Sequence, residues 1–447
     1  MKHQGTTTPI SPALHRAIIA AAIGNFITWF EYASYGFLAV ILGRVFFPVS
    51  TPSASLLATF AAFGISFLMA PLGALFFGRL GDRVGRKKIL ASVILLMSGS
   101  TFVIGLLPSY AAIGIASPIL MVMMRMLQGF ASGGEPGGAA TFLVESAQPG
   151  KRAWTVSYWH CSSFLANAVA SAFILGLTAT ISAEALQSWG WRIPFLISGV
   201  LGVVAFYIRS QLEDTHAFKT MQETEGVSEA PLTEALRFHW RQVLQTAGCI
   251  ALQGAAFYFI FVYIETYLKV QLGVSFLQAS VSNVTCLFLA SVSIFIFARI
   301  SDRIGRKPVL LLGALLCTLA IYPIFLVFST GVFGLIVMGH AILGVCLAVF
   351  MSASGPALVE IFPTRVRYAG FSMGFNLSVA IFGGSAAYVA TYLIDFTGSP
   401  LSPALLVLTT GIIATLSVLT LKETAGSKID LDNQQEHSHK LANARRH

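Results

Sequence analysis

The chain has 447 residues, of which 55% are hydrophobic and only 11% are charged, and its formal net charge is +9. Soluble domains carry about 25% charged residues, so this composition excludes an ordinary soluble protein of two or three domains. The positive charge does not indicate nucleic-acid binding, because the basic residues are distributed among loops between long apolar segments.

Apolar segments long enough to cross a membrane recur along the whole chain. A helix that crosses the hydrocarbon core needs about 20 predominantly apolar residues. Twelve segments meet this requirement, at 17–43, 56–79, 89–107, 115–146, 153–181, 192–209, 243–268, 279–300, 309–328, 332–360, 368–394 and 403–421. We therefore expect an all-α membrane protein with twelve transmembrane helices. The first segment is too long for the core of a signal peptide, so we expect it to be retained.

Basic residues are concentrated in alternate loops, which predicts the orientation of the chain. Cytoplasmic loops of membrane proteins are enriched in Lys and Arg. If both termini are cytoplasmic, all but four of the 28 Lys and Arg residues lie on the cytoplasmic side. Three of the four, Arg44, Arg192 and Lys269, lie on the outer side, and Arg125 lies within the fourth segment. The sequence thus predicts a multi-pass membrane protein with both termini in the cytoplasm.

A charged sequence occurs twice, as "GRLGDRVGRKK" at 78–88 and as "ARISDRIGRKP" at 298–308. It follows the second and the eighth apolar segment, which indicates two similar halves. Two such six-helix halves, with a binding site between them near the membrane midplane, are one major transporter architecture. We expect a cytoplasmic tail at 1–16 and a first six-helix half at 17–209. A cytoplasmic linker at 210–241 joins it to a second six-helix half at 242–421, and a cytoplasmic polar tail follows at 422–447.

The repeated charged sequence can be interpreted as a gate. Its aspartates are placed to accept hydrogen bonds from an Arg or from a helix N-terminus, and its basic residues can anchor at the anionic inner leaflet. Such a network can hold the two halves together in one state and release them in another. A purely topological enrichment in basic residues does not explain the repeated order. The candidate gating residues are Asp82, Arg83, Gly85, Arg86, Asp302, Arg303, Gly305 and Arg306.

This charged sequence resembles the loop signature of the major facilitator superfamily of transporters. Further stretches resemble one branch of it, the metabolite:proton symporters: "GNFITWFEYASYGF" (24–37), "RMLQGFASGGE" (125–135), "WGWRIPF" (189–195), "LEDTHAF" (212–218) and "EIFPTRVRYAGFSMGFNLSVAIFGG" (360–384). The resemblance implies a transporter of the bacterial cytoplasmic (inner) membrane that carries proline and betaines, or carboxylates such as α-ketoglutarate, citrate and shikimate. The chain departs from the branch at Thr28, where an acidic residue is usual, and at Glu31, where Asp is usual.

Two carboxylates within the apolar segments are candidates for proton coupling. An ionisable side chain at membrane depth is costly and therefore indicates function. Glu31 lies near the middle of the first segment, and Glu135 lies in "GGEPGG" of the fourth. Glycines and Pro136 loosen the helix there, and irregular backbone in a membrane is tolerated only beside protein or a water-filled cavity. Burial would favour protonation of such a carboxylate.

Four further residues are candidates for substrate binding. Arg125 keeps its charge and offers a bidentate fork for a carboxylate, although a structural ion pair with Glu31 explains it equally well. In carboxylate-carrying relatives an Arg commonly occupies the matching place, which favours an organic acid slightly. Tyr258 and Trp159 can hold a quaternary ammonium by cation–π contact, and otherwise they pack within the bundle. Asn376 is a plausible hydrogen-bond donor to the transported solute.

The leading functional hypothesis is a secondary transporter that couples proton entry to import of a small carboxylate or zwitterion. We expect it not to be an enzyme and to need no cofactor and no metal. The sequence lacks the phosphate-binding loop of nucleotide hydrolases, so we also expect that nucleotide hydrolysis does not drive transport. We expect a functional monomer whose partners are the solute, protons and lipid. The alternatives are a proton-antiporting exporter of drugs or metabolites and a non-transporting sensor on the same fold.

Overall fold

The structure is a computed structural model that describes residues 12–49, 51–84, 86–210 and 231–426. Side chains at 12–17, 20, 78, 79, 81–84, 86–91, 209, 210, 231–233, 364 and 365 are not described. The predicted tail 422–447 and linker 210–241 therefore lie largely outside the described residues, as do the side chains of the first charged sequence. Within the described ranges every regular element is helical.

The first half of the chain supplies the first six predicted segments. Its helices are α1 (Pro12–Phe37), α2 (Ala39–Phe46), α3 (Pro52–Val84), α4 (Arg86–Leu106), α5 (Tyr110–Ile113), α6 (Ala116–Ser132), α7 (Glu135–Ser146), α8 (Arg152–Thr180), α9 (Ala183–Ser188), η1 (Gly190–Arg192) and α10 (Ile193–Ser210). The fourth segment is divided into α6 and α7 at Gly133 and Gly134. The first is bent by 66° between α1 and α2.

The second half begins with the short helix α12 and supplies the other six segments. Its helices are α12 (Pro231–Phe238), α13 (Trp240–Tyr258), η2 (Phe259–Tyr263), α14 (Ile264–Val270), α15 (Phe276–Ile304), α16 (Arg306–Phe328), α17 (Phe333–Glu360), α18 (Thr364–Ser378), η3 (Val379–Gly383), α19 (Ala386–Thr397) and α20 (Ala404–Thr420). The seventh and eleventh segments are thus interrupted by the π-helical turns η2 and η3.

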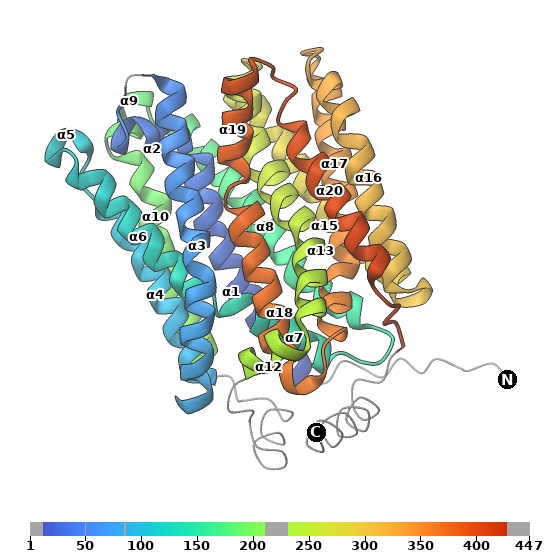
Figure 1. Ribbon diagram of the computed structural model, residues 1–447. Helices are drawn as coiled ribbons and strands as arrows, with labels where there is room; N and C mark the ends of the chain where they lie inside the picture. Colours follow the sequence, from blue (N-terminus) through green and yellow to red (C-terminus); the bar gives the residue numbers. More distant parts are fainter. Residues whose placement is uncertain (1–11, 50, 85, 211–230, 427–447) are drawn as a thin grey trace.

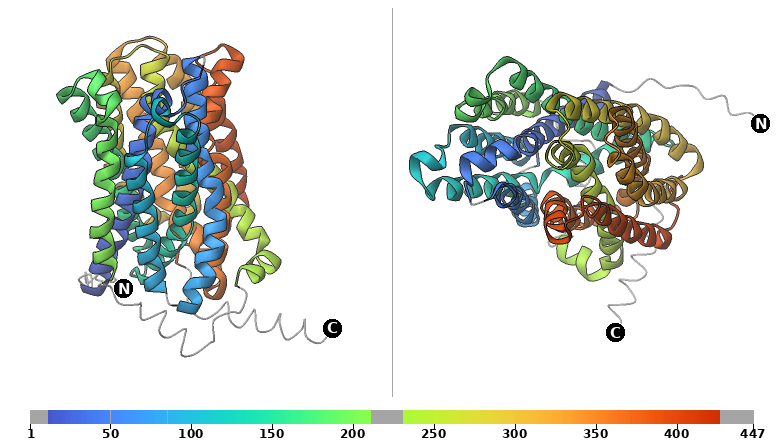
Figure 2. Two further views of the ribbon diagram at one scale, coloured as in Figure 1. Left: turned by 90° about the vertical axis from the view of Figure 1, so that its left-hand side faces the viewer. Right: turned by 90° about the horizontal axis from the view of Figure 1, so that it is seen from above.

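The twelve predicted apolar segments all correspond to one helix or to a run of consecutive helices, so the predicted fold is confirmed. Among the described residues, eight helices are long and apolar enough to span a membrane, and α1 with α2 forms a ninth candidate. Two shorter apolar helices, Ser92–Leu106 and Ala404–Thr420, belong to the third and twelfth segments. The helices run side by side, and the two halves form adjacent bundles (Figures 1 and 2).

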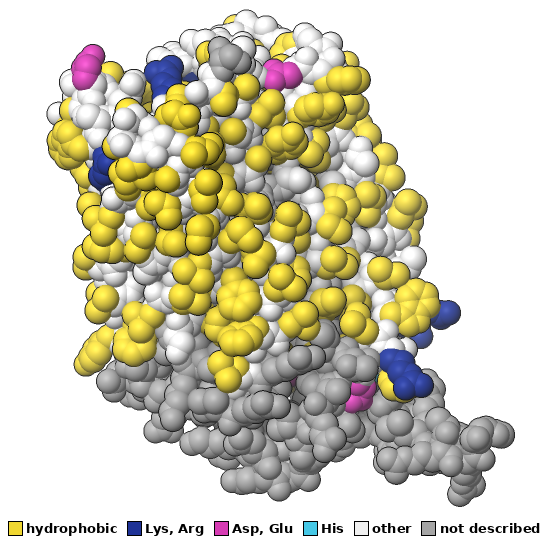
Figure 3. All heavy atoms as spheres, turned by 60° about the vertical axis from the view of Figure 1, so that its left-hand side comes forward, with side chains coloured by type: hydrophobic (Ala, Val, Ile, Leu, Met, Phe, Trp, Pro, Cys, Tyr) yellow, Lys and Arg dark blue, Asp and Glu magenta, His cyan; other side chains and the backbone are white. Residues whose placement is uncertain are grey.

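The outer surface is apolar, as a lipid-facing surface must be. Exposed large apolar side chains lie along most of the long helices, for example Leu68, Leu72 and Phe76 on α3, Val200 and Val203 on α10, and Val292 and Ile296 on α15. In the face drawn in Figure 3 they cover the middle of the molecule, whereas charged side chains gather towards its two ends. This distribution places the hydrocarbon core between the ends of the bundle.

Candidate functional site

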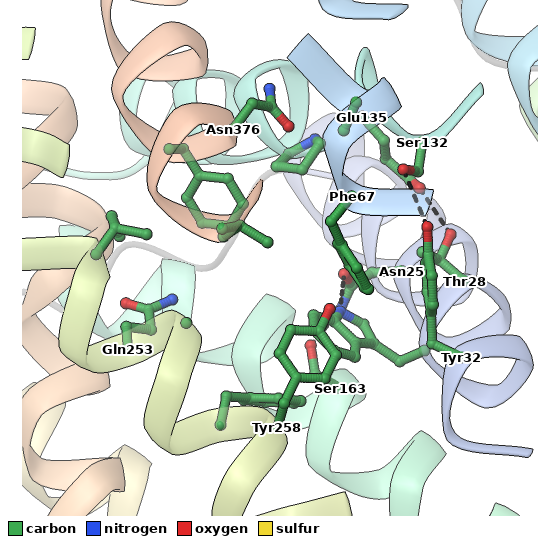
Figure 4. A pocket seen from close by; sticks show the side chains of 18 of the residues that line it. Asn25, Thr28, Tyr32, Phe67, Ser132, Glu135, Ser163, Gln253, Tyr258 and Asn376 are labelled. Carbon is green, nitrogen blue, oxygen red and sulfur yellow. Dashed lines mark hydrogen bonds between the residues drawn. The ribbon is translucent and has the colours of Figure 1, made fainter. Parts of the chain in front are cut away.

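A cavity lies between the two halves, where the interrupted helices meet (Figure 4). The first half contributes α1, α3, α6, α7 and α8, and the second half contributes α13, α17, α18 and η3. Its lining residues are Asn25, Thr28, Trp29, Tyr32, Phe67, Ala70, Ser132, Glu135, Pro136, Trp159, His160, Ser163, Ile250, Gln253, Gly254, Phe257, Tyr258, Met351, Phe375, Asn376 and Val379. Helix breaks and π-turns are common at functional sites, and here they bring polar side chains to the cavity.

Glu135 is the carboxylate of the cavity lining. The pair of glycines before it ends α6, and α7 begins with Glu135 at its N-terminus, where the helix dipole favours a negative charge. Its side chain is 4% exposed, and Thr28 Oγ1 donates a hydrogen bond of 2.6 Å to its Oε2. The predicted proton-coupling residue Glu135 thus faces the cavity, and the unusual Thr28 is its direct partner.

Aromatic rings form a wall of the cavity that extends across both halves. Trp29 lies 4.2 Å from Phe257 and 5.4 Å from Tyr258, measured between ring centroids. Phe67 lies 5.0 Å from Tyr258 and 4.9 Å from Tyr32. Rings in this arrangement can hold a cation at their faces. None of the described residues that line the cavity is Lys or Arg.

Glu31, the other predicted proton-coupling residue, is not among the lining residues of the cavity. It is fully buried and accepts hydrogen bonds from Ser98 Oγ (2.7 Å), Thr101 Oγ1 (2.7 Å) and Gln128 Nε2 (3.4 Å). A second carboxylate therefore lies on α1, three residues after Thr28, but within a closed polar network.

Arg125, a predicted substrate-binding residue, also lies outside the cavity lining. Its guanidinium carbon is 4.2 Å from the ring centroid of Tyr35, 4.9 Å from that of Phe63 and 5.2 Å from that of Tyr32. Its NH1 donates a hydrogen bond of 2.5 Å to Gln128 Oε1. Gln128 thus connects the guanidinium to the Glu31 network, so the alternative of a structural link to Glu31 is met through this bridge and not through a direct ion pair.

The three other predicted substrate-binding residues, Trp159, Tyr258 and Asn376, all line the cavity. Asn376 Nδ2 donates to Gly133 O of the other half at 3.1 Å, so this side chain also joins the halves. The sequence analysis did not single out Asn25 and Gln253 as cavity residues. Both residues are amides in the middle of an apolar segment, a feature that could have identified them as candidates for the cavity lining.

Asp302, from the second charged sequence, connects the two halves at one end of the bundle. Its carboxylate accepts hydrogen bonds of 3.0 Å from the backbone N–H groups of Ala153 and Trp154, at the start of α8. Arg306 NH1 donates to the same carboxylate at 2.7 Å. A helix N-terminus and a guanidinium are the two partners expected for this aspartate. We call this end, with residues 145–152, 302–306 and 360–367, the charged end.

Further ion pairs at the charged end extend this network. Glu360 on α17 pairs with Arg152 of the first half at 3.1 Å and with Arg306 Nε at 3.5 Å. Glu145 pairs with Arg367 across the halves at 2.8 Å. Removing one partner of a buried pair is costly, so the pairs of Glu360, whose side chain is fully buried, resist separation of the halves.

The remaining residues of the second charged sequence have separate environments. Gly305 has φ of 113°, and a Cβ there would lie 2.6 Å from Glu423 Oε2. Glu423 accepts hydrogen bonds from the backbone N–H groups of Arg306 (2.8 Å) and Lys307 (3.0 Å). Burial would raise the pKa of Glu423, but its backbone N–H donors lower that pKa below the usual value. Arg303 is exposed. The gating roles of Asp82, Arg83, Gly85 and Arg86 fall outside the described side chains.

Replacing Asp302 with Asn is expected to open the charged end more often, because a neutral amide holds a helix N-terminus and Arg306 less strongly than a carboxylate does. A cysteine introduced at the buried position Ala357 should then react severalfold faster with a water-soluble maleimide. The matched control is Arg303→Gln, which changes an exposed charge one residue away and should leave the rate unchanged. Equal rates in all three proteins would contradict the gating role of Asp302.

At the opposite end, which comprises residues 46–49, 51–53, 264–271 and 391–398, Glu265 joins the halves. It is fully buried and accepts hydrogen bonds from Ser171 of the first half (3.0 Å), Ser280 (3.1 Å) and Asn283 (3.0 Å). Lys269 Nζ, four residues further along the same helix, pairs with it at 3.2 Å. Ser53 also donates to Asp395 across the halves. The two halves are therefore in contact at both ends of the bundle.

Replacing Ser171 with Ala is expected to loosen the opposite end. It removes one donor from a buried carboxylate, and an unmet bond of this kind costs about 1–3 kcal/mol. Spin labels on Val49 and Gly398 should therefore report a larger population with a longer separation, measured by double electron–electron resonance. Thr180→Ala, near the exposed end of the same helix, is the control. A distance distribution identical to that of the parent would refute the role of Ser171.

Two six-helix bundles with a cavity between them, lined by aromatic rings and a few polar side chains, are the arrangement of a multi-pass membrane transporter. Residues 17–234 match the family model "Sugar (and other) transporter", and residues 246–445 match "Major Facilitator Superfamily". The chain belongs to the major facilitator superfamily, and within it to the metabolite:proton symporters. Members of this family transport small solutes and are not enzymes.

Several named relatives are similar over most of the chain. The proline/betaine transporter of Escherichia coli (strain K12) is 37% identical over 427 residues, which cover 92% of this chain and 84% of that protein. The glycine betaine/proline/ectoine/pipecolic acid transporter OusA of Dickeya dadantii is 35% identical, with 93% and 85% covered. The proton:xylose symporter XylE, solved with 6-bromo-6-deoxy-D-glucose, aligns with a TM-score of 0.76 at 15% identity, covering 94% of this chain and 98% of that one.

Proposed function

We propose that this protein imports a small zwitterion of the proline and betaine class together with protons. One observation carries the proposal: the cavity combines aromatic faces with the carboxylate of Glu135 and has no Lys or Arg among its described lining residues. Such a lining suits a solute that bears a positive charge on an alkylated nitrogen. The names of the two relatives, which are transporters of proline and betaines, support the same class.

A purely anionic solute suits this cavity less well. A di- or tricarboxylate brought near Glu135 would meet a like charge and no neutralising cation, and burying such a charge is expensive. Arg125 would be the natural partner of a carboxylate, but its guanidinium is enclosed by Tyr32, Tyr35 and Phe63. We therefore propose that Arg125 is structural and that the preference is for a zwitterion rather than for α-ketoglutarate, citrate or shikimate.

In the proposed cycle Glu135 carries the coupled proton. With the opposite end open, water reaches the cavity, the charged Glu135 attracts the solute, and Glu135 then takes up a proton before the cavity closes. Protonation removes a buried charge, so the loaded cavity can close at lower cost. The charged end then opens as the contacts of Asp302 and Glu360 separate, and the proton and solute leave. Glu31, held by Ser98, Thr101 and Gln128, keeps the charge of Arg125 balanced throughout.

The orientation belongs to the same proposal. The concentration of basic residues near the charged end predicts that this end faces the cytoplasm, with both chain termini on that side. A bacterial cytoplasmic membrane then supplies a proton gradient directed inward through the opposite end. A solute that moves together with the protons is then carried into the cell. An antiporting exporter would instead need the proton and the solute to occupy the cavity in turn.

The direct test is a binding panel on the purified protein. Glycine betaine, proline, α-ketoglutarate, citrate and shikimate would be compared by isothermal titration calorimetry. We expect saturable binding of glycine betaine or proline and none of the three acids. Binding of an acid alone would refute the proposed class of solute. Saturable zwitterion binding without flux in proteoliposomes would instead indicate a sensor.

A further inference from the structure

The cavity side formed by α8, α13 and α17 carries nitrogen atoms that are able to donate hydrogen bonds and have no partner among the described residues. Trp159 Nε1 and His160 Nε2 are buried and have no partner among the described residues. Trp159 is 5% exposed and His160 is 2% exposed, and both line the cavity. Buried polar groups are satisfied in most proteins, so two neighbouring exceptions in a binding cavity require an explanation.

Gln253 on α13 adds a third donor to the same side. Its Oε1 accepts a hydrogen bond of 2.6 Å from Ser354 Oγ on α17, which fixes the amide. Fixing the oxygen in this way leaves the Nε2 hydrogens as donors, and Figure 4 shows the amide nitrogen on the cavity side. With the amide held in this orientation, Gln253 Nε2 is placed to donate a hydrogen bond to an acceptor group of a bound solute.

Gln253 and His160 both lie beside one turn of α17. Ser354 holds Gln253, and the next residue, Gly355, lies against His160: a Cβ on Gly355 would be 3.4 Å from Nε2. The rings of Trp159 and His160 are 4.8 Å apart between centroids. Figure 4 shows Gln253 and Glu135 on opposite sides of the cavity. The Gln253 amide therefore lies away from the carboxylate that would repel an anion.

We propose that Trp159, His160 and Gln253 form a subsite for the carboxylate group of the solute. This inference rests on the proposed function, because it assigns the two charges of a zwitterion to opposite sides of the cavity. The carboxylate accepts hydrogen bonds from Trp159 Nε1, Gln253 Nε2 and the imidazole of His160. The substituted ammonium lies against Trp29, Phe67 and Tyr258. Glu135 is then free to exchange the coupled proton.

This arrangement explains how the cavity selects a zwitterion over a simple cation. Neutral donors stabilise an anion without adding a fixed positive charge, so a cation is not repelled from the rings nearby. A solute without a carboxylate leaves the donors unpaired, and unpaired buried donors are costly. The subsite thus predicts a preference for glycine betaine over choline, which has the same ammonium group and no carboxylate.

The test compares glycine betaine and choline on the parent, Trp159→Phe and Gln253→Met, using binding to the purified full chain. Trp159→Phe keeps an aromatic ring and removes only the N–H donor. We expect glycine betaine to bind each variant about tenfold or more weakly, as loss of a hydrogen bond to a charged group predicts, and choline affinity to stay unchanged. Trp189→Phe, the same substitution at an exposed position outside the cavity, is the control.

Each result has a distinct meaning. Glycine betaine affinity equal to that of the parent in both variants overturns the subsite while leaving the proposed function intact. An equal loss for both ligands in Trp159→Phe also overturns it, because the ring and not the N–H would then be responsible. A parent that binds neither glycine betaine nor proline overturns the proposed function and the subsite together. Choline binding too weak to measure in the parent supports the subsite if betaine binding falls in the variants.

Discussion

Glu135→Gln is expected to abolish accumulation of the solute driven by a proton gradient while preserving exchange. Glutamine keeps the shape of the side chain and can still accept a hydrogen bond from Thr28 Oγ1, which lies 2.6 Å from Glu135 Oε2. Glutamine cannot take up or release a proton, so the charge of this side chain is the same throughout the transport cycle. The solute can then equilibrate across the membrane, but no proton movement drives it uphill.

The size of this effect follows from the coupling. One pH unit corresponds to a tenfold concentration ratio for a solute coupled to one proton, so a gradient of about two units supports roughly 100-fold accumulation. The variant should reach no accumulation in proteoliposomes, with counterflow of labelled solute similar to the parent. Glu184→Gln, at an exposed position, is the control. Gradient-driven accumulation by Glu135→Gln would show that another group carries the proton.

Arg125→Ala is expected to be the most destabilising single substitution at the site. The guanidinium is fully buried against three rings and bonded to Gln128. Its removal leaves Gln128 and the Glu31 network without their cation, and removing one partner of a buried charged pair costs about 3–5 kcal/mol. Arg125→Lys should lose less, because an ammonium retains the charge but stacks less well on Tyr35.

Thermal unfolding and ligand binding distinguish this structural role from a substrate role. If Arg125 is structural, Arg125→Lys melts earlier than the parent, and the folded fraction binds glycine betaine with unchanged affinity. If Arg125 contacts the solute, the melting temperature stays near that of the parent while affinity falls about tenfold or more. The two readouts move in opposite ways, so a single set of measurements decides between the roles.

Much of the fold was predictable because the bilayer imposes it. A spanning helix must be apolar over its whole length, so the twelve segments could be located from composition alone. The repeated charged sequence marked the two halves. The breaks were harder. The glycines and Pro136 predicted the one between α6 and α7, whereas the π-turn η2 contains no glycine or proline, and the pair Gly383–Gly384 at η3 was not interpreted as a break.

The site was only partly predictable, because a sequence does not give the rotation of a nearly uniform apolar helix. Glu135, Trp159, Tyr258 and Asn376 line the cavity. Arg125 lies on the face of α6 that meets Tyr35 and Phe63. Its position in the sequence, ten residues before Glu135, does not predict which neighbouring helices this face contacts. The partners of Asp302 depended on contacts between distant segments.

The partners of Glu265 also depended on long-range packing. Its pairing with Lys269 followed from helical spacing alone, since residues four apart share a face. Ser171, Ser280 and Asn283 come from α8 and α15, and only the packed structure brings them to the same carboxylate. The role of Glu265 in joining the halves was therefore not accessible from the sequence.

The measurement that tests the central claim most directly is proton movement on addition of solute. Proteoliposomes holding the parent in a weakly buffered medium, without an imposed gradient and with charge compensated by valinomycin and potassium, would receive glycine betaine while external pH is recorded. We predict alkalinisation of the medium that saturates with solute and is absent in Glu135→Gln. Uptake of labelled glycine betaine with no change of external pH, or with acidification, would contradict proton-coupled import.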